Sequence, residues 1–112
     1  MEQIRAMLAN VRSSYSSWQE AIDGLLRMRT LAAEGQDFDG EPPTTELIDA
    51  SLNLATAMRD DNVTPPLVVA GANGSVYFEW RGDRYIELEV IEPFKAKIRK
   101  GAREVSFTWT PR

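Results

Sequence analysis

The chain contains no cysteine and no histidine. Without cysteine there is no disulfide framework, no thiol nucleophile and no zinc–thiolate site. Without histidine the chain lacks the commonest general base, the commonest transition-metal ligand and every Ser-His or Cys-His nucleophile pair. These two absences predict a protein that is not an enzyme and that carries no cofactor and no metal.

The chain also lacks long apolar runs and a strong charge of either sign. No stretch approaches the ~20 consecutive apolar residues that a membrane-spanning helix needs. The opening residues, MEQIRAMLANVRSSYSS, do not have the basic segment and apolar run of a signal peptide. The formal net charge of −4 argues against a surface that binds nucleic-acid phosphates. We therefore expect a cytoplasmic protein that binds neither membranes nor nucleic acid.

What the chain does contain is the composition of one ordinary globular domain. It has 112 residues, of which 43% are hydrophobic and 27% charged, enough to build a single core. The patterns divide it into a helical arm over residues 1–34, a second helix over 44–61 and an antiparallel sheet over 66–110. The expected fold class is α+β, with both helices packed on one face of a four- or five-stranded antiparallel meander sheet.

Helical patterning dominates the first third of the chain. Apolar and aromatic residues follow one another at alternating spacings of four and three, as in a heptad seam: Ile4, Leu8, Val11, Tyr15, Trp18, Ile22 and Leu25. This seam predicts one long N-terminal helix from Glu2 to about Ala33. Ser17 and Glu20 allow an alternative, because together they form a capping box that would start a second helix there.

The length of such a helix indicates a role for it. About 30 residues would measure roughly 45 Å, whereas the strands of a small sheet are roughly 17 Å long. Part of the seam would then have no partner within the chain. We therefore expect the N-terminal helix to mediate self-association or to bind another protein, through a set of candidate interaction residues: Ile4, Leu8, Val11, Tyr15 and Trp18.

A loop over residues 35–44 leads into the second helix. Thr44 is the expected N-cap, and Glu46 lies in the first turn, where the helix dipole favours a negative charge. Pro65 and Pro66 prevent the helix from continuing. Its apolar residues fall mostly along one face: Leu47, Ile48, Leu52, Leu54, Ala55 and Met58.

From Leu67 onward the apolar period becomes two, which is typical of strands with one buried face. Asn73-Gly74 is a hairpin signal. Arg81-Gly82-Asp83 resembles the tripeptide that adhesion proteins display to integrins, but it falls where the alternation must reverse, so we expect a turn. The apolar positions are Val76, Phe78, Trp80, Ile86, Leu88, Val90, Phe94, Ala96, Ile98, Val105, Phe107 and Trp109.

The opposite face of this sheet is expected to be charged. Acidic residues on two strands face basic residues on the next: Glu79, Glu87 and Glu89 beside Lys95, Lys97 and Arg99. Opposite charges across antiparallel strands stabilise a sheet by roughly 0.2–1 kcal/mol a pair. The pattern fits a solvated face that fixes strand register. Alternatively, the face is a charged docking surface with Tyr77 and Tyr85 as anchors.

An acidic loop, GQDFDGEPPTTE over residues 35–46, partly matches a calcium-binding EF-hand loop. Matching residues stand at positions 3, 5, 6 and 12 of that pattern: Asp37, Asp39, Gly40 and Glu46. However, position 1 is a glycine rather than a carboxylate, and two prolines occupy positions 8 and 9. Asp37, Asp39 and Glu41 could also supply a catalytic carboxylate pair, which would need a concave site. We expect instead a turn and a Pro-Pro entry into the second helix.

Three stretches carry a family resemblance: DFDGEPPTTELIDAS, PPLVVAGANGSVYFEW and DRYIELEV. Over residues 35–92 or so the chain resembles a group of small uncharacterised bacterial proteins with an aromatic-Asp-Gly loop, a Pro-led helix and a hairpin ending in Glu-Trp. Phe38 stands where that group is expected to have tryptophan, and the N-terminal helix is not part of the resemblance. The resemblance implies no activity. It implies that the Asp39-Gly40 loop and the Glu79-Trp80 strand are shared structural features.

Two functional hypotheses follow from these patterns, and a third is kept beside them. The first is a non-enzymatic cytoplasmic protein-interaction module, a homodimer or larger homo-oligomer that associates through its N-terminal helix. The alternative is an antitoxin or immunity-type inhibitor of a partner protein, because small size and acidity fit that class. The third is a calcium-modulated module, which depends on the acidic loop.

Overall fold

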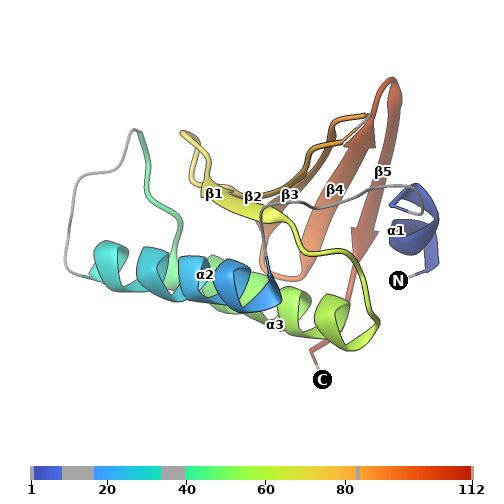
Figure 1. The fold of residues 1–112 in the computed structure, drawn as a ribbon. Helices are drawn as coiled ribbons and strands as arrows, with labels where there is room; N and C mark the ends of the chain where they lie inside the picture. The colour runs from blue at the N-terminus through green and yellow to red at the C-terminus, as the bar shows by residue number, and fades with distance from the viewer. Residues whose placement is uncertain (1, 9–16, 34–39, 83, 112) are drawn as a thin grey trace.

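A computed structural model describes residues 2–8, 17–33, 40–82 and 84–111. These ranges form an α+β fold, as the sequence predicts, with three helices and a five-stranded antiparallel sheet (Figure 1). The elements in chain order are α1 (Glu2–Met7), α2 (Trp18–Ala33), α3 (Thr45–Asp60), β1 (Leu67–Ala70), β2 (Val76–Trp80), β3 (Ile86–Glu92), β4 (Lys95–Lys100) and β5 (Arg103–Thr108).

The sheet is a meander in which each strand pairs with its neighbour in sequence, in the order β1-β2-β3-β4-β5. The register places Phe78 opposite Leu88, and Leu88 opposite Ile98. Because side chains alternate between the two faces of a strand, this register collects the apolar positions on one face. That face is buried, and Phe78, Leu88 and Ile98 have no exposed surface. The predicted alternation is therefore confirmed.

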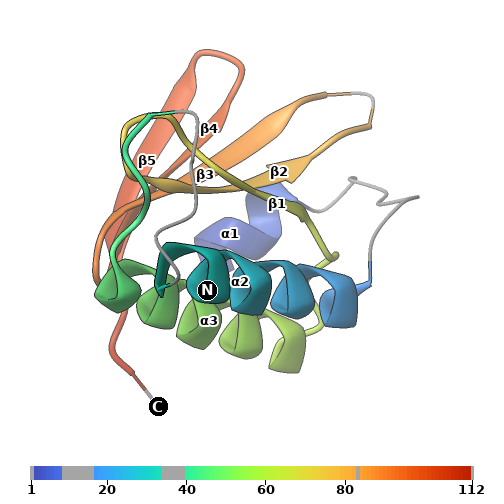
Figure 2. The same cartoon turned by 90° about the vertical axis from the view of Figure 1, so that its left-hand side faces the viewer.

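The helices cover the apolar face of the sheet (Figures 1 and 2). α2 and α3 lie side by side, with α2 next to β1 and α3 across β2 and β3. Two indole nitrogens fix this arrangement through the link between α3 and β1. Trp18 Nε1 donates to the Val63 carbonyl at 2.6 Å, and Trp80 Nε1 donates to the Thr64 carbonyl at 2.7 Å. The start of α2 and the end of β2 are thus hydrogen-bonded to two adjacent residues of the link.

The prediction of one long N-terminal helix is wrong. α1 ends at Met7, and α2 begins at Trp18 as a separate helix in a different place (Figure 1). The capping alternative is the correct one, because Ser17 Oγ accepts the Glu20 backbone N–H at 3.1 Å. A serine side chain that satisfies the first N–H groups of a helix favours a start at that point over passage through it. Val11 and Tyr15 of the predicted seam lie outside the described residues.

α1 is folded back onto the core instead of extending beyond it. Ile4, Met7 and Leu8 are all buried. Lys100 at the end of β4 donates its Nζ to the Met7 carbonyl at 2.9 Å, which satisfies a carbonyl at the end of α1. Arg5 lies 3.9 Å from Asp61, at the end of α3. Ile4 and Leu8 of the predicted seam are therefore buried within the molecule.

α3 agrees closely with its prediction. Thr44 is the N-cap, and its Oγ1 accepts the Leu47 N–H at 3.1 Å. Leu47, Ile48, Leu54 and Met58 are buried on one side of the helix. None of the helices in the described ranges combines the length and the hydropathy that crossing a bilayer requires.

Both predicted turns lie where the alternation of the strands reverses. Asn73-Gly74 falls between β1 and β2, and Gly74 has a positive φ of 82°. The Asn73 side chain accepts the Ser75 N–H at 3.3 Å, which closes the turn. Arg81 and Gly82 lie between β2 and β3, whereas Asp83 is outside the described residues.

Candidate functional site

The outer face of the sheet, opposite the helices, gathers polar side chains from neighbouring strands. We define it by residues that share one side of the pleat: Val69 and Leu67 on β1, Tyr77 and Glu79 on β2, Glu87 and Glu89 on β3, Lys97 and Arg99 on β4, and Glu104 on β5. The predicted pairing is confirmed, because Glu87 stands opposite Arg99 and Glu89 stands opposite Lys97.

Arg99 is the centre of this face. Its guanidinium donates to Glu87 at 2.8 Å, to Glu89 at 2.9 Å and to Glu104 at 2.8 Å, so it joins β3, β4 and β5. The hydrogen bonds to Glu89 and Glu104 raise the pKa of Arg99 above its usual value. A planar guanidinium that engages three carboxylates at once has few alternative orientations. The middle of the face is therefore a fixed polar platform.

Glu89 is the buried member of the platform, with only 7% of its surface exposed. Ser75 donates its hydroxyl to the carboxylate at 2.8 Å, and Asn73 donates its side-chain amide at 3.4 Å. Burial alone would raise the pKa of Glu89, but the hydrogen bonds from Ser75 and Arg99 outweigh it and lower the pKa. The β1–β2 turn and β4 thus hold one carboxylate between them.

Tyr85 directly precedes β3 and extends the outer face beside Glu79 and Glu87, with 46% of its surface accessible. Its hydroxyl donates to Glu79 at 2.5 Å, and Glu87 is a second acceptor at 3.3 Å. Partial burial and the bond to Glu79 raise the pKa of Tyr85. On the other side of Glu79, the register places Leu67, which is 44% exposed. Tyr85, Glu79 and Leu67 form a row that we call the tyrosine row.

The predicted interaction residues that the structure describes divide into three groups, and Val11 and Tyr15 lie outside the described residues. Tyr77 and Tyr85 lie on the outer face, as the docking interpretation required. Ile4 and Leu8 are only 2% and 5% exposed because α1 packs on the core, and their role as contact residues stays a prediction. Trp18 is half-buried at the start of α2.

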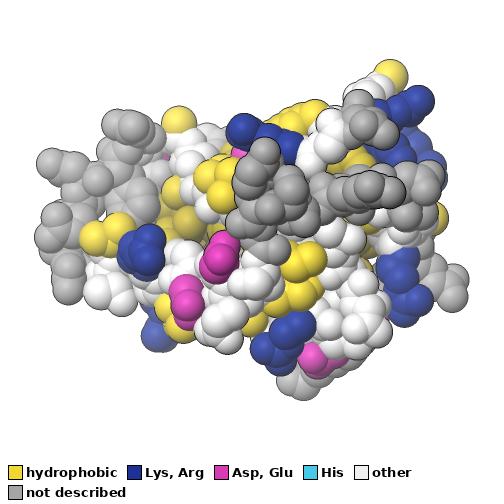
Figure 3. All heavy atoms as spheres, in the orientation of Figure 1, with side chains coloured by type: hydrophobic (Ala, Val, Ile, Leu, Met, Phe, Trp, Pro, Cys, Tyr) yellow, Lys and Arg dark blue, Asp and Glu magenta, His cyan; other side chains and the backbone are white. Residues whose placement is uncertain are grey.

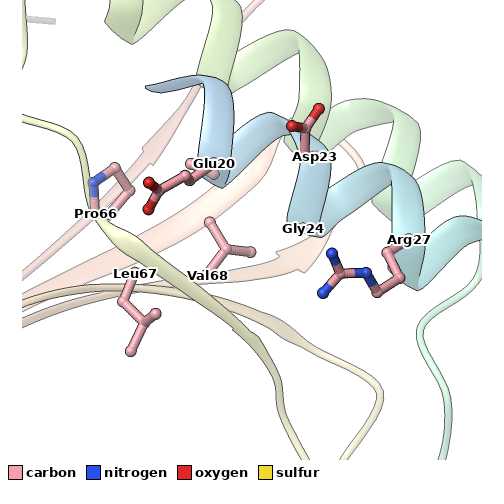
Figure 4. A pocket seen from close by; sticks show the side chains of 8 residues that line it. Glu20, Asp23, Gly24, Arg27, Pro66, Leu67 and Val68 are labelled. Atoms are coloured by element: carbon pink, nitrogen blue, oxygen red, sulfur yellow. The ribbon is translucent and has the colours of Figure 1, made fainter. Parts of the chain in front are cut away.

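A groove between α2 and β1 is a feature that the sequence patterns did not predict. It has a volume of about 390 Å³, and its lining residues are Glu20, Ala21, Asp23, Gly24 and Arg27 of α2 with Pro66, Leu67 and Val68. Val68 points toward α2 and Leu67 away from it, while Glu20 and Arg27 reach toward the strand from either side of Gly24 (Figure 4). In Figure 3, hydrophobic side chains over β1 stand next to charged ones over α2. The sequence feature that could have indicated this groove is Gly24, a glycine in the middle of a helix.

The acidic loop adds no ligand set to these surfaces. Asp37 and Asp39 lie outside the described residues, and Glu46 is exposed in the first turn of α3. Among the residues that the structure describes, no group of three or more Asp or Glu side chains is placed to hold a metal ion. Glu41 instead bridges to Asn73, with its N–H donated to the Ala72 carbonyl at 3.0 Å.

Comparisons with known proteins give no relative from which a role for the outer face or the groove could be inferred. No protein-family model, no curated protein and no solved structure matches the chain. The likeness to small bacterial proteins that the three sequence stretches suggest therefore stays a prediction.

Proposed function

We propose that the chain is a non-enzymatic, cytoplasmic protein-interaction module that binds a partner protein through the outer face of its sheet. The observation that carries this proposal is the tyrosine row. An exposed tyrosine is held in one orientation by a carboxylate, and an exposed leucine lies on the other side of that carboxylate. Tyrosine and arginine contribute much of the binding energy at many protein interfaces, and a side chain that is ordered before binding loses less entropy.

The stiffness of the support favours the same conclusion. Arg99 joins three strands, and Glu79 receives both the Tyr85 hydroxyl and, at 3.4 Å, the guanidinium of Arg81. Side chains that are already ordered lose little conformational entropy when a partner binds. The proposal moves the interaction surface from the N-terminal helix, whose apolar residues are buried, to the sheet.

An antitoxin or immunity-type inhibitor is the narrower form of this proposal. The net charge of −4 favours, at long range, the approach of a basic partner. An inhibitor would use the outer face to cover a basic functional surface of that partner. Growth arrest on expression of the captured partner alone, relieved by co-expression of this chain, would support it. A partner that does not arrest growth when expressed alone would contradict the inhibitor hypothesis.

The proposal is tested by photo-crosslinking from the outer face. A photoreactive amino acid replaces Arg81, whose side chain is 66% exposed beside the tyrosine row, and the matched control places it at exposed Thr56 on α3. We expect a defined crosslinked partner from position 81 only. The purified partner should then bind Tyr85→Ala at least ~10-fold more weakly than wild type, and Tyr85→Phe with a smaller loss. Equal products from both positions would contradict the proposal.

A further inference from the structure

β1 is an edge strand, and in the described chain it pairs with β2 alone. The outward side of its backbone therefore offers N–H and C=O groups to another extended segment. The groove is lined by Pro66, Leu67 and Val68 at this edge (Figure 4). α2 runs next to β1 below the sheet (Figure 2), so a strand added to the edge would lie over the groove. Backbone pairing and side-chain pockets together are what strand addition requires.

Gly24 keeps the groove open at a cost to α2. It is in the middle of a 16-residue helix, where glycine is less favourable than alanine. A Cβ built on Gly24 would meet nothing within 4 Å, so no close packing within the described residues requires a glycine. A larger side chain at this position would project into the space between Glu20 and Arg27. The absence of a side chain at Gly24 therefore leaves the groove open.

The two ends of the groove carry opposite charges. Glu20 reaches toward Pro66 at one end, and Arg27 leans toward Val68 from the other, whereas Asp23 points away from the strand (Figure 4). Arg27 is seven positions after Glu20 in α2, which is about 10.5 Å along the helix axis. Residues i and i+2 of an extended segment share a face and lie about 6.6 Å apart. Long charged side chains on both sides can span the difference.

We propose that an extended segment of a partner protein adds to the free edge of β1 and places two oppositely charged side chains in the groove. A lysine or arginine of the segment pairs with Glu20, and an aspartate or glutamate two residues away pairs with Arg27. The residue between them faces the outer side, near Leu67. This surface shares Leu67 with the tyrosine row but does not include Tyr85 or Glu79, so variants of Tyr85 and of Gly24 test the two surfaces independently.

The first test selects peptides rather than assuming a sequence. A phage-displayed library of random octapeptides is panned against the immobilised wild-type protein. We expect the enriched peptides to be rich in β-branched residues and to carry a basic and an acidic residue two positions apart. Enrichment of unrelated patterns, or no enrichment at all, would overturn the proposal.

The second test asks where the selected peptides bind. Gly24→Leu fills the groove and should weaken binding at least 10-fold, while its thermal unfolding temperature is unchanged or higher. Thr56→Leu on α3 is the control for an added leucine and should bind as wild type does. The charge reversal Glu20→Lys should weaken the same peptides, and a peptide with its basic residue changed to glutamate should regain binding to that variant. Unchanged binding to Gly24→Leu would overturn the proposal, and Tyr85→Ala should leave binding unchanged.

Discussion

Among single residues, Glu89 shows best how the outer face is stabilised. Its carboxylate receives hydrogen bonds from Ser75, Asn73 and Arg99, which come from the β1–β2 turn and from β4. A buried carboxylate without such partners would be strongly destabilising, so each of these donors offsets part of the desolvation. The face is polar by composition, yet one of its members is as buried as a core residue.

Glu89 should make the stability of the protein depend on acid pH. Its pKa in the folded protein is below the ordinary value of 4.5, so ionised Glu89 stabilises the fold above about pH 4.5. That contribution is lost as the pH falls through the folded-state pKa. We expect Glu89→Gln to lower the free energy of unfolding by about 1–2 kcal/mol at pH 7, and by less at pH 3. Urea unfolding at both pH values measures this difference.

A matched control for Glu89 is available on the same guanidinium. Glu104 also binds Arg99, but its side chain is 50% exposed. Exposed ion pairs contribute about 0–1 kcal/mol, so Glu104→Gln should cost less at pH 7 than Glu89→Gln. An equal loss for Glu89→Gln at pH 3 and pH 7 would contradict the role that we assign to the ionised carboxylate.

The sequence predicted the side of the sheet on which Glu89 lies, but not its depth. Alternation with Leu88 and Val90 assigns the face, and the opposite charge of Lys97 assigns a cross-strand neighbour. The donors Ser75 and Asn73 belong to a turn, and their approach depends on the three-dimensional path of that turn. Local patterns carry no information on such contacts, and for this reason the buried part of the site was not predictable.

At the level of elements, the boundary between α1 and α2 was the main error. The heptad spacing passes from Ile4 and Leu8 to Trp18, Ile22 and Leu25 without a change of phase. Both described helices contribute to one core, so their apolar residues can share a spacing although the helices are separate. Periodicity reports which side of a helix is buried, whereas the capping residue reports where the helix starts.

The cap of α2 gives a direct test of this boundary. Ser17→Ala removes the side-chain acceptor of the Glu20 N–H. We expect a loss of about 0.5–2 kcal/mol in the free energy of unfolding, measured by urea unfolding followed by circular dichroism. Ser17→Asp should retain the stability, because aspartate is an equally good cap. If Ser17 lay within a continuous helix, alanine would be neutral or stabilising there instead.

The sheet and α3 were predictable for a physical reason that α1 does not share. Each strand pairs with its sequence neighbour, so local alternation and turn residues are enough to define the meander. Thr44 and the prolines bound α3 on both sides. α1 instead packs against the end of β4, far along the chain, and no local pattern could place it there. The groove beside β1 was missed for the same reason.

For the whole molecule, the position of α1 predicts that its apolar residues stabilise the fold and do not mediate association. Ile4→Ala and Leu8→Ala each remove a buried aliphatic side chain, and we expect a loss of about 2–4 kcal/mol in unfolding free energy. The oligomeric state, measured by light scattering on the folded protein, should be the same as in wild type. Leu31→Ala on the exposed side of α2 is the control and should change stability little.

If either substitution lowered the molar mass of the assembly without lowering the free energy of unfolding, the N-terminal residues would be an interface for self-association. In that case Ile4 and Leu8 would contact a second copy of the chain. The two measurements therefore separate a core role from an interface role for the same residues.

The contact between Lys100 and Met7 has a consequence for the order in which the protein folds. These residues are 93 positions apart, whereas the hairpins of the meander close over short loops. Loop closure over a short distance is faster and loses less chain entropy. A ribosome also releases Met7 long before it makes Lys100. We therefore expect α1 to reach its final position only after β4, which carries Lys100, has joined the sheet.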